Sequence, residues 1–168
     1  MNMNSRIIAI TSWILVAWIC NIFLTSLFYK FTGHPDTVYI FNTIGGWLGG
    51  FLGASIGGLF SQYGAYLIGS FELLTSIVLL SPILLWVVKK LSPAVNTPRR
   101  SLMHCIGGVM AAAVMSGAVF FHLVSPLGVE VLHEGKGDGG SLFYAAVSIL
   151  VSGIILFILN RKQHPDKN

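Results

Sequence analysis

Charge and long polar stretches are what this sequence has least of. Only 10% of its 168 residues are charged and just six are acidic, whereas 54% are hydrophobic. Four apolar stretches, at about 7–29, 42–88, 102–125 and 141–160, take up most of the chain. This composition excludes a soluble globular domain and predicts a protein embedded in a lipid bilayer. We expect one transmembrane domain over residues 1–168, with no separate soluble domain.

Cysteine is nearly absent too, and its two copies form no recognisable site. Cys20 and Cys105 make neither a C-x-x-C pair nor a zinc-ligand spacing, so we predict two packing residues. The sequence also has no Walker loop, no zinc pattern and no Ser-His-Asp or Cys-His arrangement. We therefore predict no metal site and no covalently bound cofactor. Whether the chain is an enzyme stays open.

The apolar stretches predict an all-α, polytopic membrane protein. An apolar helix of ~20 residues crosses a bilayer core about 30 Å thick. We expect a bundle of four transmembrane helices at about 7–29, 63–88, 102–124 and 142–160. The first stretch is longer than the core of a signal peptide, which has ~7–15 residues, and so we expect a retained helix.

The segment 42–60 carries seven glycines between Gly45 and Gly58. Several lie four residues apart, a spacing that favours close helix contact in lipid. If 42–60 were a full crossing, the basic loop at 89–100 would lie outside the cell, against the usual charge bias. We prefer an additional re-entrant or interfacial helix at about 42–60 on the outer side of the membrane.

The basic residues predict the orientation. Basic loops stay in the cytoplasm, and eight of the ten Lys and Arg residues would be cytoplasmic if both termini and the 89–100 loop were inside. These eight are Arg6, Lys89, Lys90, Arg99, Arg100, Arg161, Lys162 and Lys167. The net charge of +4 is therefore a consequence of topology, and we expect no nucleic-acid partner.

Glu72 is the one carboxylate inside the apolar stretches. An ionisable group at the centre of a membrane helix costs ~2.5–3.5 kcal/mol on insertion scales and usually marks a functional site. The structural alternative is a carboxyl group that joins two helices by hydrogen bonds. Lys30, His122 and Asp138 map to the same outer half, which favours a polar pocket that opens outward, although wet loops would produce the same pattern.

Four short segments resemble the DoxX-like family of bacterial membrane proteins. They are FYKFTG at 28–33, GSFELL at 69–74, FFHL at 120–123 and DGGSLF at 138–143. The resemblance implies a four-helix membrane bundle in the bacterial cytoplasmic (inner) membrane. It also implies that Lys30, Glu72, His122 and Asp138 are ligand-binding positions. The glycine-rich segment 45–58 is longer than we expect for this family.

Founding members of that family resemble the membrane subunit of a thiosulfate:quinone oxidoreductase, and others associate with redox-defence proteins. Our first hypothesis is thus a membrane subunit of a redox system that binds quinone in an outer-leaflet pocket. The chain has no evident redox centre of its own, so a soluble or membrane redox protein would supply the electrons. A small transporter or channel-like protein is the second hypothesis. An assembly or scaffolding factor without catalysis is the third, and homo-oligomers through the small-residue helix faces are expected with any of them.

Overall fold

The computed structural model describes residues 3–92 and 94–161, and most of them are helical. The helices are α1 (Met3–Phe31), α2 (Pro35–Leu52), α3 (Ala54–Leu91), α4 (Arg100–Val124) and α5 (Ser141–Arg161). A small antiparallel hairpin of β1 (Leu132–His133) and β2 (Lys136–Gly137) lies between α4 and α5. Four of the helices, α1, α3, α4 and α5, are long and apolar enough to cross a membrane. The prediction of an all-helical chain with four such helices is confirmed.

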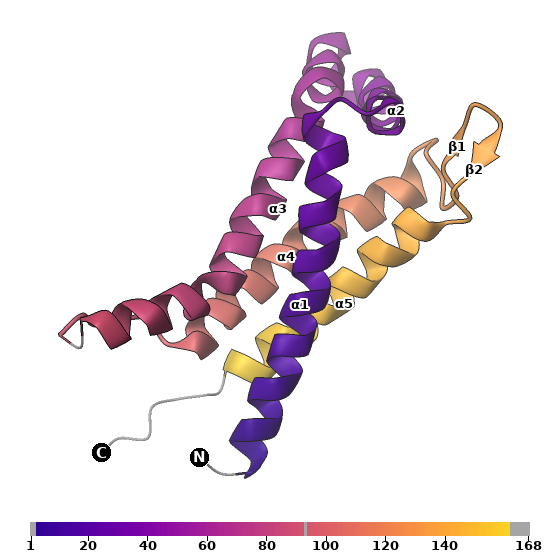
Figure 1. Cartoon of the computed structure of the whole chain (residues 1–168). Coiled ribbons are helices and arrows are strands. Elements are labelled where there is room, and N and C mark those ends of the chain that lie inside the picture. Colours follow the sequence, from indigo (N-terminus) through magenta and orange to yellow (C-terminus); the bar gives the residue numbers. More distant parts are fainter. Residues whose placement is uncertain (1–2, 93, 162–168) are drawn as a thin grey trace.

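These four helices form the bundle, in which α4 pairs closely with α5 and α1 packs on α3 and α5. Figure 1 shows the first and last described residues at one end, and α2 and the β1–β2 hairpin at the other. We call the end with the termini the proximal end and the end with α2 the distal end. Both α1 and α4 run from the proximal to the distal end, and α3 and α5 run back.

The segment predicted as one helix at 42–60 is divided between two helices. α2 already begins at Pro35, whose ring fixes φ as the first helical turn requires. It ends at Leu52, because Gly53 has a φ of +94°, a conformation that L side chains rarely adopt. α3 then starts at Ala54 and continues without interruption into the predicted second span. The predicted helix limits are wrong here because apolar periodicity carries no signal for this one break.

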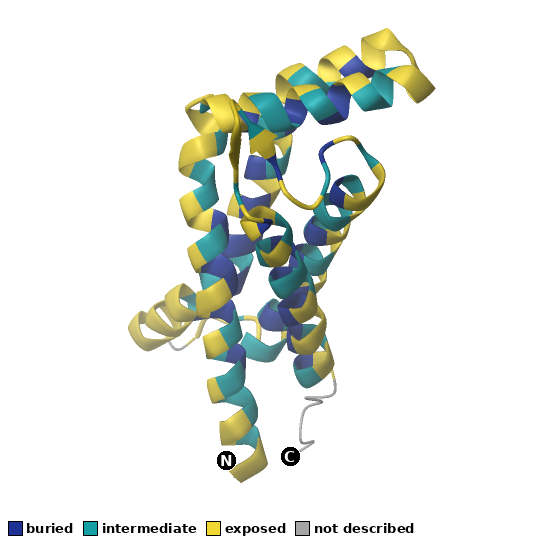
Figure 2. Cartoon of the chain, turned by 90° about the vertical axis from the view of Figure 1, so that its right-hand side faces the viewer, coloured by how far each residue is buried: buried dark blue, intermediate teal, exposed yellow. Residues whose placement is uncertain are grey.

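Glycines let α2 and the first part of α3 lie against each other. A Cβ atom added at Gly57 would lie 2.7 Å from the Cα atom of Gly49 and would collide with the carbonyl oxygen of Gly45. The small-residue spacing therefore does serve close helix contact, within one hairpin. Figure 2 shows this α2–α3 hairpin projecting sideways from the distal end of the bundle.

α3 is longer than a membrane requires. Its 38 residues span about 57 Å at 1.5 Å per residue, against a bilayer core of about 30 Å. Its first part pairs with α2, and its last part turns away from the bundle in Figure 1. Pro82 lies in this helix, and a proline inside a helix removes one backbone hydrogen bond and bends the axis.

The core of the bundle is a layer of aliphatic side chains. Val16, Ile19, Leu79 and Leu156 are fully buried there. Large apolar side chains such as Ile14 cover the outside instead. Figure 2 shows this distribution, with buried residues facing inward and exposed ones facing outward along the spans. An apolar exterior is what a lipid environment favours.

The α4–α5 contact depends on two glycines. A Cβ atom added at Gly153 would lie 2.6 Å from the carbonyl oxygen of Gly108, and one at Gly108 would lie 2.7 Å from the carbonyl oxygen of Gly153. The two backbones therefore meet directly at this point.

Candidate functional site

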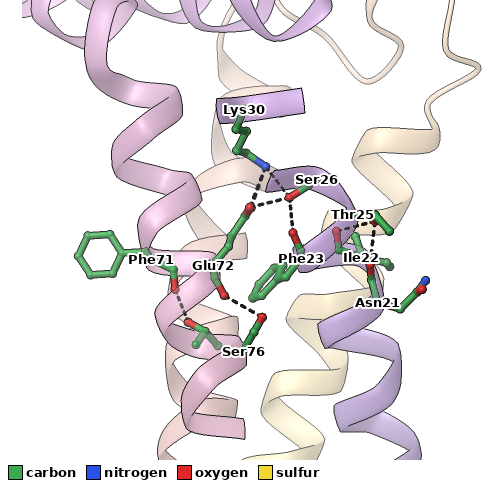
Figure 3. A network of polar contacts seen from close by, with 10 residues as sticks. Asn21, Ile22, Phe23, Thr25, Ser26, Lys30, Phe71, Glu72 and Ser76 are labelled. Carbon is green, nitrogen blue, oxygen red and sulfur yellow. Dashed lines mark hydrogen bonds and ion pairs between the residues drawn. The ribbon is translucent and has the colours of Figure 1, made fainter. Parts of the chain in front are cut away.

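Lys30 and Glu72 meet between α1 and α3. The Lys30 Nζ atom lies 2.8 Å from Oε2 of Glu72 and 3.0 Å from Oε1. Nζ also donates to Ser26 Oγ at 3.0 Å, and that hydroxyl lies 2.7 Å from Glu72 Oε2. Figure 3 shows the three side chains pointing toward one another. Lys30 is therefore the cation that pairs with the buried Glu72 carboxylate.

Both charges of this pair are largely removed from water. The Glu72 side chain is 3% exposed and the Lys30 side chain 16%. An isolated buried charge is costly, and removing one partner of such a pair leaves the other uncompensated. Ser26 supplies a further contact because it precedes Lys30 by four residues and so shares its face of α1. Ser26 is not among the predicted site residues, although its spacing from Lys30 was a usable signal.

The Lys30–Glu72 pair forms part of the wall of a cavity of about 420 Å³ in the distal half of the bundle. All five helices contribute to its wall, which is mainly aliphatic and aromatic. Its polar and titratable lining side chains are Thr25, Ser26, Tyr29, Lys30, Asp36, Thr37, Glu72 and His122. A volume of this size, with apolar walls and a few polar groups, is typical of a small-molecule site.

His122 reaches the same cavity from the last turn of α4. Its Nδ1 atom lies 2.7 Å from the carbonyl oxygen of Gly128, which can only accept a hydrogen bond. Nδ1 therefore carries a proton, and Nε2 is the ring nitrogen left for a ligand. The ring is fixed further by an edge-to-face contact with Phe143, at 5.7 Å between ring centroids. This orientation makes His122 a well-positioned group rather than a mobile interfacial one.

Asp36 lines the cavity as well, although it is not among the predicted site residues. Its Oδ1 atom lies 2.8 Å from His133 Nδ1, and the His133 ring stacks on Tyr39 at 4.6 Å. These contacts attach the β1–β2 hairpin to the start of α2. Of the three residues only Asp36 lines the cavity, and its contact with His133 joins two segments that are distant in sequence, which sequence spacing alone could not reveal.

Asp138 has a different position from the other three predicted site residues and is not among the residues that line the cavity. Its carboxylate accepts hydrogen bonds from the backbone amides of Val131, Gly140 and Leu142 and from the Ser141 hydroxyl. It thereby caps the start of α5. Partial burial raises the pKa of Asp138, but these hydrogen bonds outweigh that effect and hold the pKa below its ordinary value of 3.8.

The structure thus brings together Lys30, Glu72 and His122, adds Ser26 and Asp36, and separates Asp138 from them. Among residues 3–92 and 94–161, no three His, Cys, Asp or Glu side chains gather closely enough to hold a metal ion. The arrangement can accept an apolar molecule that carries hydrogen-bonding groups, with an ion pair and an imidazole as its polar contacts.

Known proteins offer no match to this chain: no family model, no curated protein and no solved structure matches it.

Proposed function

We propose that this chain is a DoxX-like membrane subunit of a redox system and binds quinone in the distal cavity. One observation carries the proposal: the buried Lys30–Glu72 pair and the oriented imidazole of His122 line one apolar cavity of about 420 Å³. A pair that served only to join helices needs no cavity beside it. Here the polar groups adjoin a space large enough for a ligand.

The residues of the cavity fit a quinone. Such a molecule has an apolar ring with two carbonyl oxygens, and it supplies chemistry by accepting two electrons and two protons. The aliphatic and aromatic wall matches the ring, and the Lys30 ammonium group places a positive charge beside the cavity. His122 donates from Nε2 to a carbonyl oxygen when it is protonated, and accepts at Nε2 from a hydroxyl group when it is neutral.

Each residue has a separate task in this proposal. Lys30 supplies positive charge that stabilises negative charge on the ligand, and Glu72 keeps that ammonium group in place. His122 holds or releases a proton at Nε2, while the Gly128 carbonyl oxygen fixes the orientation of the ring. Electrons are exchanged with a partner redox protein, either soluble or in the membrane.

We further propose that the chain lies in the bacterial cytoplasmic membrane with both termini inside. Four spans support this arrangement, because an even number of crossings places the termini and the basic loop after α3 on one side. The distal cavity then opens in the outer leaflet. Of the basic residues that support the orientation, Lys162 and Lys167 lie outside the described residues.

The α2–α3 hairpin is then an interfacial element on the outer side, which is the proposal that the Gly-rich segment first suggested. Its sideways projection from the bundle supports this (Figure 2). A Cβ atom added at Gly46, Gly50 or Gly58 meets no atom within 4 Å. These three glycines therefore take no part in the contact between α2 and α3.

Transport is the weaker candidate. α1 runs outward through Val16 and Ile19 before it reaches the cavity, and α3 continues from Glu72 to Leu79 on the way inward. These three aliphatic side chains are fully buried, so a packed apolar layer separates the cavity from the proximal end. A transport path would have to open this layer.

The test is purification of the protein from its membrane in mild detergent, followed by mass spectrometry of everything that co-elutes. We expect quinone to be retained by the wild type and lost from His122→Gln and Glu72→Gln, while His133→Gln retains it. A co-eluting redox protein would identify the partner. Equal retention of quinone by the wild type and both cavity variants would contradict the proposal. A protein that purifies without quinone, but always with the same non-redox membrane partner, would favour the scaffolding hypothesis.

A further inference from the structure

A second cavity, of about 450 Å³, lies at the proximal end between the start of α4 and the last part of α3. Trp13 of α1 contributes to it, together with Ile83, Trp86 and Lys89 of α3. Thr97 and Arg100 complete it from the loop before α4 and from the first residue of that helix. Among the described residues, none lines both this cavity and the distal one.

The charge in this cavity is of one sign. Lys89 and Arg100 both line it, and none of the described residues in its wall is acidic. Arg100 is held in position by its own helix, because Nη1 lies 3.3 Å from Nδ1 of His104 one turn later. His104 is fully buried, and its ring packs edge-to-face on Trp13 at 4.8 Å between ring centroids. Two cations that converge on one cavity favour an anionic ligand.

The rest of the cavity wall indicates that the ligand also has an apolar part. Ile83 and the two tryptophans give the cavity an apolar side, and tryptophan prefers the level of lipid head groups in a membrane protein. A free inorganic anion would find no partner on that side. A phosphate group attached to an apolar chain would occupy both sides at once.

We propose that this proximal cavity binds an acidic phospholipid, with its phosphate between Lys89 and Arg100 and an acyl chain along Ile83. Basic pockets between membrane helices on the cytoplasmic side are suited to acidic lipid head groups. Thr97 offers its hydroxyl to the same phosphate. The site does not depend on what the distal cavity binds.

Native mass spectrometry of the purified protein, titrated with phosphatidylglycerol or phosphatidylcholine, tests this site. Each basic residue near a membrane surface is worth about 1 kcal/mol toward acidic lipid, so losing both cations predicts roughly 30-fold weaker binding. We expect that loss in Lys89→Gln/Arg100→Gln. The matched control is Arg6→Gln/Arg161→Gln, which removes the same charge from the same end of the bundle, outside the cavity, and should change binding less than threefold.

A second variant keeps the test decisive if the double substitution unfolds the protein. Lys89 is exposed, so Lys89→Gln alone should fold and bind phosphatidylglycerol roughly 5-fold more weakly. An equal loss in the two double variants, or equal binding of both lipids by the wild type, would overturn the proposal. Inorganic phosphate that binds as tightly as phosphatidylglycerol would overturn the assignment to a lipid.

Discussion

The distal and proximal halves of the bundle both contain buried polar groups, but the hydrogen bonding and the surroundings of these groups differ between the halves. At the distal end Lys30, Glu72 and Ser26 satisfy one another and border a cavity. At the proximal end Asn160 donates to Ser12 Oγ at 3.0 Å and to its own helix, and neither side chain lines the distal or the proximal cavity.

The proximal polar groups are also incompletely paired. Asn160 Oδ1 and His104 Nε2 are buried and have no hydrogen-bond partner among the described residues. A buried polar group in a membrane bundle is therefore not by itself a ligand site. At the distal end an ion pair, complete hydrogen bonding and an adjoining cavity occur together, and this combination, which the Ser12–Asn160 contact lacks, favours a ligand site.

The largest expected effect comes from breaking the distal ion pair. Lys30→Met leaves Glu72 buried without its cation, and removing one partner of a buried pair costs about 3–5 kcal/mol. We expect a loss of that size in the free energy of unfolding, measured by SDS titration with circular dichroism. Lys30→Met/Glu72→Met should recover most of it, because the two substitutions share one interaction. A loss below about 1 kcal/mol for Lys30→Met would show that the carboxylate does not depend on this ammonium group.

The close contact between α4 and α5 gives the next effect. Gly153→Ala places a Cβ atom 2.6 Å from the Gly108 carbonyl oxygen, and such overpacking costs about 1–3 kcal/mol. Gly46→Ala is the matched control, since its added Cβ atom meets no atom within 4 Å. The control should be neutral or slightly stabilising, because alanine favours a helix. Equal effects of the two substitutions in the same unfolding assay would refute the close α4–α5 contact.

Asp138 gives a contrast within the distal half, because its carboxylate accepts hydrogen bonds from backbone amides and does not line the cavity. Asp138→Ala should destabilise the protein by about 1 kcal/mol at neutral pH through loss of a helix cap. Since the pKa of Asp138 is lowered in the folded protein, its contribution is fully present above the ordinary value of 3.8 and is lost as pH falls through the lowered folded value. Unfolding curves at a series of pH values should therefore converge for the two proteins in acid. A gap that stays constant with pH would argue against a charged cap.

The smallest effect is expected at the proximal end. Ser12→Ala/Asn160→Leu removes both partners of one hydrogen bond and also the unpaired Asn160 oxygen. Replacing both partners by apolar groups is nearly neutral, so the unfolding free energy should change by less than about 0.5 kcal/mol. A loss comparable to that of Lys30→Met would erase the distinction between the two halves.

The parts of the fold that depend on composition were predictable from sequence. Span length and hydropathy located four membrane-type helices, because a bilayer imposes both. Gly53 was not recognised as the break between α2 and α3, since it is one of many glycines in that segment and only its positive φ distinguishes it. The α2–α3 contact through Gly49 and Gly57 could be expected from their small size, but their pairing within one hairpin could not.

The candidate site was predictable to a similar extent. Glu72 and His122 could be placed in one half of the bundle by counting residues from the helix ends. The contact of Asp36 with His133, nearly 100 positions away, is present in no local sequence pattern. Asp138 was grouped with the site because it maps to the same outer half and because the segment 138–143 resembles the DoxX-like family. Its four hydrogen bonds show that depth does not determine which way a side chain faces.

The most direct measurement is a titration of purified protein with a short-chain quinone by isothermal calorimetry, comparing two leucine substitutions. Gly117 lines the distal cavity and Gly46 does not, and an added Cβ atom meets no neighbour within 4 Å at either position. Gly117→Leu therefore fills the cavity, whereas Gly46→Leu leaves it free. We predict saturable binding by the wild type and Gly46→Leu, and at least tenfold weaker binding by Gly117→Leu, roughly 1.4 kcal/mol. Equal binding by all three proteins, or none by the wild type, would contradict a quinone site in this cavity.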